Sequence, residues 1–165
     1  MSMKLLFITQ KIDKEDAVLG VYHEWVRAIA GKIDSVEALC LYKGSYDLPE
    51  NVAVHSLGKE KGWSHFKYAF NFYKYIFSLR KKYDVVFVHM NSIYIPLGWL
   101  FWKLMGKKIV FWYAAYKIFP MTRLALLLSD KAVTSVPEAF KAKSKKIIAI
   151  GQGIDTKRFY RNSSI

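Results

Sequence analysis

The feature that most constrains the fold is a pair of short apolar runs, Val85 to Val88 and Ile109 to Tyr113. Both runs are rich in Val, Ile and aromatic residues and are apolar at consecutive positions, which is typical of strands in a parallel sheet that is covered on both faces. Parallel neighbours need a crossover, and residues 93–105 between the runs predict a helix. The stretch therefore predicts an α/β fold with a doubly wound, mainly parallel sheet and helices on both faces.

Polar or small residues follow both runs, at the points where the strands would end. They are His89, Asn91, Tyr113, Ala114 and Ala115. In open parallel sheets, ligands bind outside the carboxyl ends of the strands. We therefore expect these residues to lie on the rim of a binding site.

The rest of the chain continues the alternation of strands and helices. We expect strands over 3–9, 35–42, 52–57, 131–135 and 145–150, and helices over 20–33, 64–83 and 121–128. Gly20 would open the first helix after a strand and a polar loop, an arrangement that can build an anion site from backbone N–H groups. Val21, Trp25 and Ile29 would form the buried face of that helix.

Composition limits the function classes. The net charge is +13, from 26 Lys and Arg against 13 Asp and Glu, and predicts an acidic partner: a phosphate-bearing ligand, anionic lipid or nucleic acid. A lone Cys40 rules out an internal disulfide and fits a buried position in a reducing compartment. We expect no signal peptide and no membrane span. The four histidines are too scattered for a zinc site, so no metal is expected.

The helix over 64–83 has an unusually wide apolar surface. At ~100° per residue its apolar arc spans roughly 220°, about twice what docking on a sheet requires. An anionic membrane surface would suit the surplus, and a neighbouring helix or a further domain is the alternative. The residues expected to face the membrane are Phe66, Tyr68, Phe72, Lys74 and Tyr75.

Five segments, in this order, resemble one family. They are L-L-F-I-T-Q-K-I-D-K-E-D-A-V-L-G (5–20), V-H-M-N-S-I-Y (88–94), W-Y-A-A (112–115), S-D-K-A-V-T-S-V-P-E-A-F-K-A-K-S (129–144) and K-K-I-I-A-I-G-Q-G-I-D-T-K-R-F (145–159). Together they are similar to the N-terminal domain of retaining glycosyltransferases of family 4 (group 1), which have the two-domain GT-B fold. The last segment resembles that family's interdomain G-x-G-[IV]-D-x-x-x-F.

The resemblance implies a division of the chain. Residues 1–150 would be a Rossmann-like acceptor-binding domain and 151–165 the interdomain linker, with the C-terminal donor-binding domain absent from this sequence. Gly20, His89, Asn91 and Tyr113 match positions that line the cleft. Ala115 stands where the family's W-Y-x-H motif has its histidine, and alanine can neither donate nor accept a proton.

The resemblance also implies a function. In the full enzyme a glycosyl group would move from a nucleotide sugar to a saccharide or membrane-associated, lipid-linked acceptor, with no further cofactor, and this chain alone would be inactive. The location would be cytoplasmic, peripheral on the inner face of the cell membrane. The alternative is a stand-alone basic module that binds anionic lipid or nucleic acid. Nucleic acid is less favoured, because the aromatic residues follow predicted cores rather than an exposed stacking platform.

Overall fold

The computed structural model describes residues 3–151 and 153, which form a seven-stranded sheet in the order β3-β2-β1-β4-β5-β6-β7. The strands are β1 (Lys4–Ile12), β2 (Ser35–Lys43), β3 (Val52–Ser56), β4 (Val85–His89), β5 (Lys108–Trp112), β6 (Lys131–Thr134) and β7 (Ile147–Ala149). All neighbouring strands pair in parallel. The prediction of an α/β fold with a parallel sheet is confirmed, and the predicted linker, apart from 151 and 153, lies outside the described residues.

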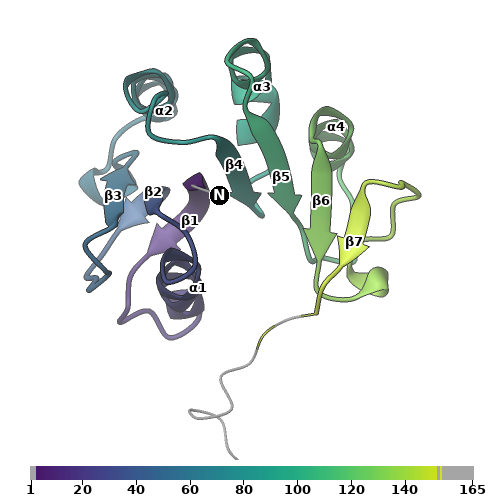
Figure 1. The fold of residues 1–165 in the computed structure, drawn as a ribbon, viewed down its shortest axis with the longest axis horizontal. Helices are drawn as coiled ribbons and strands as arrows, with labels where there is room; N and C mark the ends of the chain where they lie inside the picture. The colour runs from purple at the N-terminus through teal and green to yellow at the C-terminus, as the bar shows by residue number, and fades with distance from the viewer. Residues whose placement is uncertain (1–2, 152, 154–165) are drawn as a thin grey trace, which may run out of the picture.

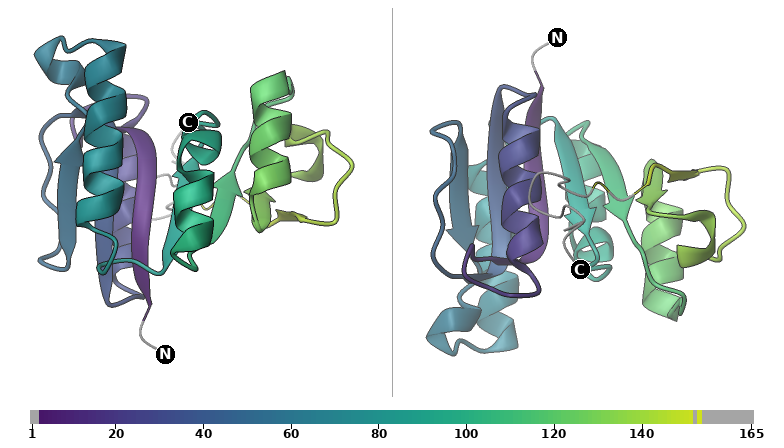
Figure 2. Two further views of the ribbon diagram at one scale, coloured as in Figure 1. Left: turned by 90° about the horizontal axis from the view of Figure 1, so that it is seen from above. Right: turned by 90° about the horizontal axis from the view of Figure 1, so that it is seen from below.

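The helices lie on both faces of the sheet (Figures 1 and 2). They are α1 (Gly20–Ala30), α2 (His65–Ser78), α3 (Tyr94–Leu104) and α4 (Pro120–Leu128), with short 3-10 turns η1 (Lys59–Lys61) and η2 (Pro137–Ala139). The α1 helix covers one face, and α2, α3 and α4 cover the other. Strand β1 divides its side chains accordingly, since Leu6 and Ile8 belong to the core under α2–α4 and Leu5 and Phe7 to the core under α1. Burial on both faces is what makes the strand sequences continuously apolar.

The buried face of α1 differs from the prediction. His23, Val26 and Ala30 are buried and Val21 is exposed, whereas Trp25 and Ile29 are half-buried as they pack against neighbouring side chains. The connection from β2 to β3 has no helix and includes Asp47, which contacts His23. The His23 Nε2 accepts a hydrogen bond from the Asp47 backbone N–H at 3.3 Å, so a histidine holds this crossover in place beside α1.

The α2 helix ends at Ser78, earlier than predicted, and its wide apolar arc is shared between two environments. Phe72 is 0% exposed and packs against Tyr94 and Trp102 of α3, with ring centroids 5.0 and 5.9 Å apart. The prediction that Phe72 faces a membrane is therefore wrong, because α3 already covers it. Phe66 is 90% exposed and Phe70 is 69% exposed.

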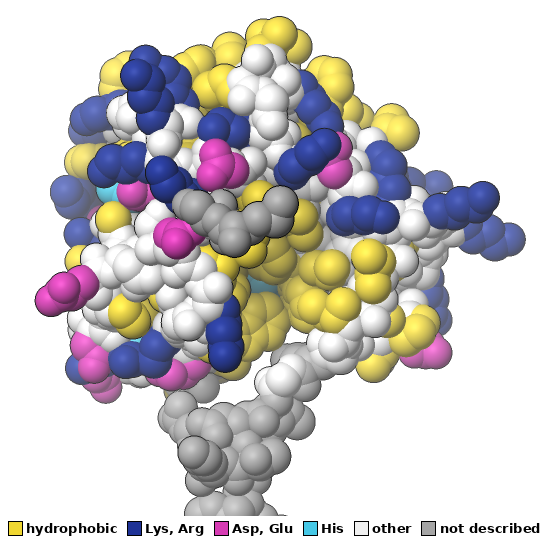
Figure 3. Space-filling model, in the orientation of Figure 1, with side chains coloured by type: hydrophobic (Ala, Val, Ile, Leu, Met, Phe, Trp, Pro, Cys, Tyr) yellow, Lys and Arg dark blue, Asp and Glu magenta, His cyan; other side chains and the backbone are white. Residues whose placement is uncertain are grey.

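The other residues expected at the membrane are placed between these extremes. Lys74 is exposed, and Tyr68 and Tyr75 are half-buried. The Tyr75 ring lies 5.0 Å from the ring of His55 in β3. Figure 3 shows hydrophobic side chains interspersed with Lys and Arg along the outer edge formed by α2, α3 and α4. In the described part of the chain, every helix is too short or too polar to cross a bilayer.

Candidate functional site

The residues predicted for the rim come together at the carboxyl edge of the sheet. Strands β4 and β5 are neighbours, and His89 pairs with Trp112 across them. The Met90 N–H donates to the Trp112 carbonyl at 2.9 Å, and the Ala114 N–H contacts the Met90 Sδ at 3.3 Å. The rim residues all lie at this edge of the sheet, but some are on the face covered by α1 and the others are on the face covered by α2, α3 and α4.

His89 lies at the centre of a closed aromatic group, which we call the His89 cluster: His89, Thr9, Tyr22, Trp25 and Trp112. The imidazole is 2% exposed, and its Nδ1 is 3.2 Å from the Thr9 hydroxyl. Its ring centroid lies 4.1 Å from that of Tyr22 and 5.4 Å from that of Trp25. Burial lowers the pKa of His89 to about 4. The imidazole is therefore neutral at pH 7 and enclosed by its neighbours.

Asn91 belongs to the opposite side because of the turn that follows β4. Side chains two residues apart in a regular strand point to the same face, which would have placed Asn91 beside His89. Met90 between them has φ of 59°, in the left-handed region that non-glycine residues rarely adopt. The turn carries Asn91 to a pocket under α2 and α3.

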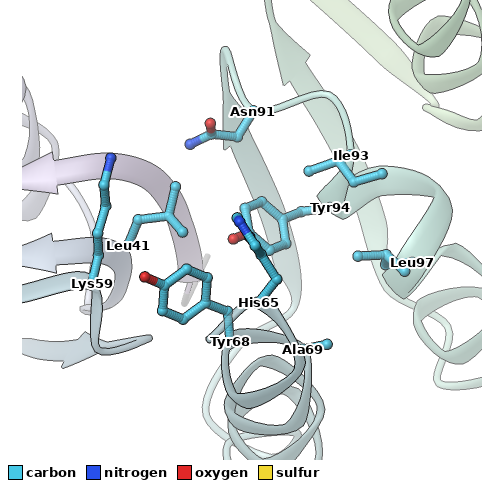
Figure 4. A pocket seen from close by; sticks show the side chains of 9 residues that line it. All are labelled: Leu41, Lys59, His65, Tyr68, Ala69, Asn91, Ile93, Tyr94 and Leu97. Carbon is cyan, nitrogen blue, oxygen red and sulfur yellow. The ribbon is translucent and has the colours of Figure 1, made fainter. Parts of the chain in front are cut away.

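This α2–α3 pocket has a volume of about 520 Å³ (Figure 4). Its lining residues come from the end of β2, η1, the start of α2, the β4–α3 loop and α3: Leu41, Lys59, His65, Tyr68, Ala69, Asn91, Ile93, Tyr94 and Leu97. Within the described chain, the buried Asn91 Nδ2 has no hydrogen-bond partner. Desolvation raises the pKa of the Tyr94 phenol, so its hydroxyl stays protonated. The pocket thus combines apolar walls with protonated hydroxyl and amide donors.

Gly20 lies at the start of α1 as predicted, but the chain already supplies an anion there. The Asp16 Oδ1 accepts hydrogen bonds from the Val18 and Leu19 N–H groups at 2.9 and 2.7 Å. Those bonds and the ion pair with Lys11, at 2.6 Å, hold the pKa of Asp16 at about 2. The carboxylate of Asp16 occupies the two backbone donors that precede the helix.

Tyr113 and Ala115 lie on the α4 side of the edge. The Tyr113 ring is buried against Phe140, with centroids 4.9 Å apart, and its hydroxyl donates to the Lys117 carbonyl. Ala115 is half-buried. Tyr113 thus contacts the core on the face opposite His89, and its hydroxyl hydrogen is already donated within the protein.

Sequence reasoning found Asn91 but missed most of the pocket around it. Lys59 lies between the strand predicted over 52–57 and the helix predicted over 64–83, His65 lies at the start of that helix, and Tyr68 was assigned to a membrane. It also missed a second hollow of about 420 Å³ beside α4, lined by Ile118, Arg123, Leu126, Lys141, Ala142 and Lys143. The predicted doubly wound sheet offered a signal only for the α2–α3 pocket, because ligands bind outside the carboxyl ends of the strands where the strand order reverses, here between β1 and β4. Among residues 3–151 and 153, no cluster of His, Cys, Asp and Glu could hold a metal ion.

Comparison with solved structures supports the fold. Anabaena HepE in complex with UDP matches with a TM-score of 0.64 at 14% identity, covering 94% of this chain and 45% of its own. The lipopolysaccharide outer core galactosyltransferase WaaB, in its apo form, matches with a TM-score of 0.60 at 12% identity, covering 94% of this chain and 47% of its own. A UDP-GlcNAc 2-epimerase from Methanocaldococcus jannaschii matches with a TM-score of 0.58 at 16% identity, covering 90% of this chain and 45% of its own.

These identities are low, so the likeness shows the fold alone: the chain has the Rossmann-like architecture of one half of a GT-B fold. The chain spans a little under half the length of the structures it matches. No protein-family model matches the sequence, and no curated protein sequence is significantly similar to it.

Proposed function

We propose that this chain is the acceptor-binding half of a retaining glycosyltransferase, and that a donor-binding half completes the enzyme. The observation that carries the proposal is the α2–α3 pocket at the carboxyl edge of the sheet, where the buried Asn91 Nδ2 has no hydrogen-bond partner among the described residues. A buried donor without a partner is costly, and a bound hydroxyl would satisfy it. The motif resemblance and the GT-B-like fold support a glycosyl group as the transferred unit.

In this proposal the chain's residues bind and orient the acceptor. Asn91 donates to an acceptor oxygen, and the Tyr68 and Tyr94 hydroxyls provide further hydrogen-bonding groups at the same pocket. Two of the residues predicted for the rim cannot serve as a general base: Ala115 has no titratable side chain, and His89 is buried with a pKa of about 4. Stabilisation of the leaving diphosphate would come from the donor half, by oriented positive groups. The chain alone is therefore expected to bind an acceptor and to transfer nothing.

Saturation-transfer difference NMR on residues 1–165 tests this assignment. Octyl glucoside below its micellar concentration should receive saturation on its sugar protons, and UDP-glucose should receive none. Asn91→Ala should reduce the octyl glucoside signal while the far-ultraviolet circular dichroism stays unchanged. Binding of UDP-glucose in preference to octyl glucoside, or sugar transfer by the chain alone, would refute the assignment.

We further propose that the protein works at the inner surface of the cell membrane, with the exposed side of α2 against the lipid. Phe66 and Phe70 are too exposed to contribute to the core, and Lys67 and Lys74 lie on the same helix. The Lys67 and Lys61 ammonium groups lie 3.9 and 4.8 Å from the Trp63 ring centroid. Aromatic side chains beside lysines suit an interface with anionic headgroups, which is consistent with the net charge of +13.

A further inference from the structure

The α2–α3 pocket is mainly apolar, which is unusual for a site that would hold only a sugar. Its walls are Leu41, Ala69, Ile93 and Leu97 and the rings of Tyr68 and Tyr94. Its volume of about 520 Å³ lies in the range of sites that bury small molecules, roughly 300–1,000 Å³. A saccharide would leave most of these walls without apolar contacts, whereas a hydrocarbon chain would cover them.

The polar and charged groups of the pocket are unevenly placed. In Figure 4, Lys59 lies across the pocket from Ile93 and Leu97, and the Asn91 amide nitrogen points toward the side of Lys59. The side chains of Lys59 and His65 are exposed at the opening. The described lining contains no carboxylate. Lys59, His65 and the Asn91 amide are all donors, which suits an anionic group at that side.

The pocket also adjoins the surface proposed to meet the membrane. His65 and Ala69 line the pocket, and their neighbours Phe66 and Phe70 are the most exposed phenylalanines of α2. Ile93, another lining residue, is itself 43% exposed. A lipid that left the bilayer beside Phe66 would therefore enter the pocket past His65, whose side chain is exposed at the opening.

We propose that the α2–α3 pocket binds a membrane lipid with a phosphate beside its hydrocarbon chain, the chain against Ala69, Ile93 and Leu97 and the phosphate near Lys59 and Asn91. The inference rests on the proposed function in one respect, because such a lipid would be the carrier of the acceptor. It names a lipid phosphate rather than free phosphate, because the apolar walls make up most of the lining.

Calorimetric titration with three probes tests the proposal on the 165-residue protein. Dodecyl phosphate, kept below its micellar concentration, should bind roughly 10-fold more tightly than dodecyl maltoside, since its phosphate can accept charge-assisted hydrogen bonds that a neutral sugar cannot. Inorganic phosphate should show no measurable binding, because it lacks the chain. Equal binding of inorganic phosphate, tighter binding of the maltoside, or no binding of dodecyl phosphate would overturn the proposal.

Two variants locate the bound lipid. Ala69→Phe should fill the apolar part of the pocket and abolish dodecyl phosphate binding, while Lys59→Glu should weaken it. Ala28→Phe is the matched control, because Ala28 is exposed on α1, on the other face of the sheet. Circular dichroism and urea unfolding confirm that each variant is folded. Unchanged binding to folded Ala69→Phe would contradict the assignment.

Failure of the lipid proposal can be distinguished from failure of the proposed acceptor function. These titrations contain no donor and measure no sugar transfer. If octyl glucoside binds at Asn91 and dodecyl phosphate does not, the acceptor assignment stands and the lipid assignment fails. If dodecyl phosphate binds and UDP-glucose is also preferred over octyl glucoside, the lipid site stands and the acceptor role fails.

Discussion

His89 and Asn91 are two positions apart and differ in almost every structural respect. His89 lies in a closed cluster on the α1 face, where Thr9 contacts its ring nitrogen and aromatic rings surround it. Asn91 lines an open pocket on the α2–α3 face, and its buried amide nitrogen has no partner within the described chain. The comparison shows that the contacts of a polar residue at a strand end decide whether it stabilises the fold or is available to bind a ligand. Its position in the sequence and its residue type do not by themselves determine which of the two roles it has.

The largest expected effect is a difference in unfolding free energy between a variant in the His89 cluster and a variant on the exposed side of α2. Trp112→Ala removes a ring of the His89 cluster whose centroid lies 4.9 Å from that of Trp25, and should cost about 3–5 kcal/mol of unfolding free energy. Phe70→Ala, on the exposed side of α2, should change it by no more than about 0.5 kcal/mol. Urea unfolding measures both. A cost for Phe70→Ala as large as that for Trp112→Ala would show that both sides are structural.

The pH dependence of stability tests how closed the His89 cluster is. The unfolded chain binds a proton at His89 once the pH falls below 6.5, whereas the folded protein resists protonation until about pH 4. The contribution of the neutral imidazole is therefore complete above pH 6.5 and is lost as the pH falls toward 4, at about 1.4 kcal/mol per pH unit.

The slope of stability against pH, measured by urea unfolding, should be steeper in the wild-type protein than in His89→Gln over this window. Comparing slopes removes any constant cost of the substitution. Equal slopes in the two proteins would mean that His89 titrates normally and that the cluster is open to water.

The sequence was sufficient to predict the sheet and its edge, for a definite physical reason. Continuous apolar runs such as Val85 to Val88 occur where both faces are buried, and parallel strands bring their carboxyl ends together. Cys40 was also placed correctly, since its thiol is buried and burial raises its pKa to about 12. These features depend on residue type and period, which a sequence displays directly.

The faces and partners of the site residues could not be predicted in the same way. Nothing in the residue type of Met90 indicates a left-handed backbone, yet that turn moves Asn91 away from His89. Phe66, Phe70 and Phe72 are alike in sequence, and only the position of α3 decides that Phe72 is covered. Such choices depend on tertiary packing between distant segments.

A smaller effect concerns the outer side of α2. Phe66→Ser should weaken binding to vesicles that contain anionic lipid by roughly 10- to 100-fold, because burying a phenylalanine is worth about 1.5–3 kcal/mol. The matched control is Val18→Ser, at a residue 77% exposed in the loop before α1. Co-sedimentation with neutral vesicles measures the apolar contribution to vesicle binding, and comparison with anionic vesicles measures the charge-dependent contribution. Equal loss in both variants would place the membrane contact elsewhere.

The smallest effect compares the polar partners directly. Thr9→Val removes the hydroxyl beside the His89 Nδ1 and leaves a buried ring nitrogen unpaired, which should cost about 1–3 kcal/mol. Asn91→Leu removes a donor that has no partner in the described chain, so unfolding free energy should stay the same or rise by up to about 1 kcal/mol. Urea unfolding of the two variants, with octyl glucoside binding measured for each, compares the structural role of Thr9 directly with the binding role of Asn91. If Asn91→Leu were as costly as Thr9→Val while octyl glucoside still bound, Asn91 would be a structural residue and the α2–α3 pocket would lose its principal donor.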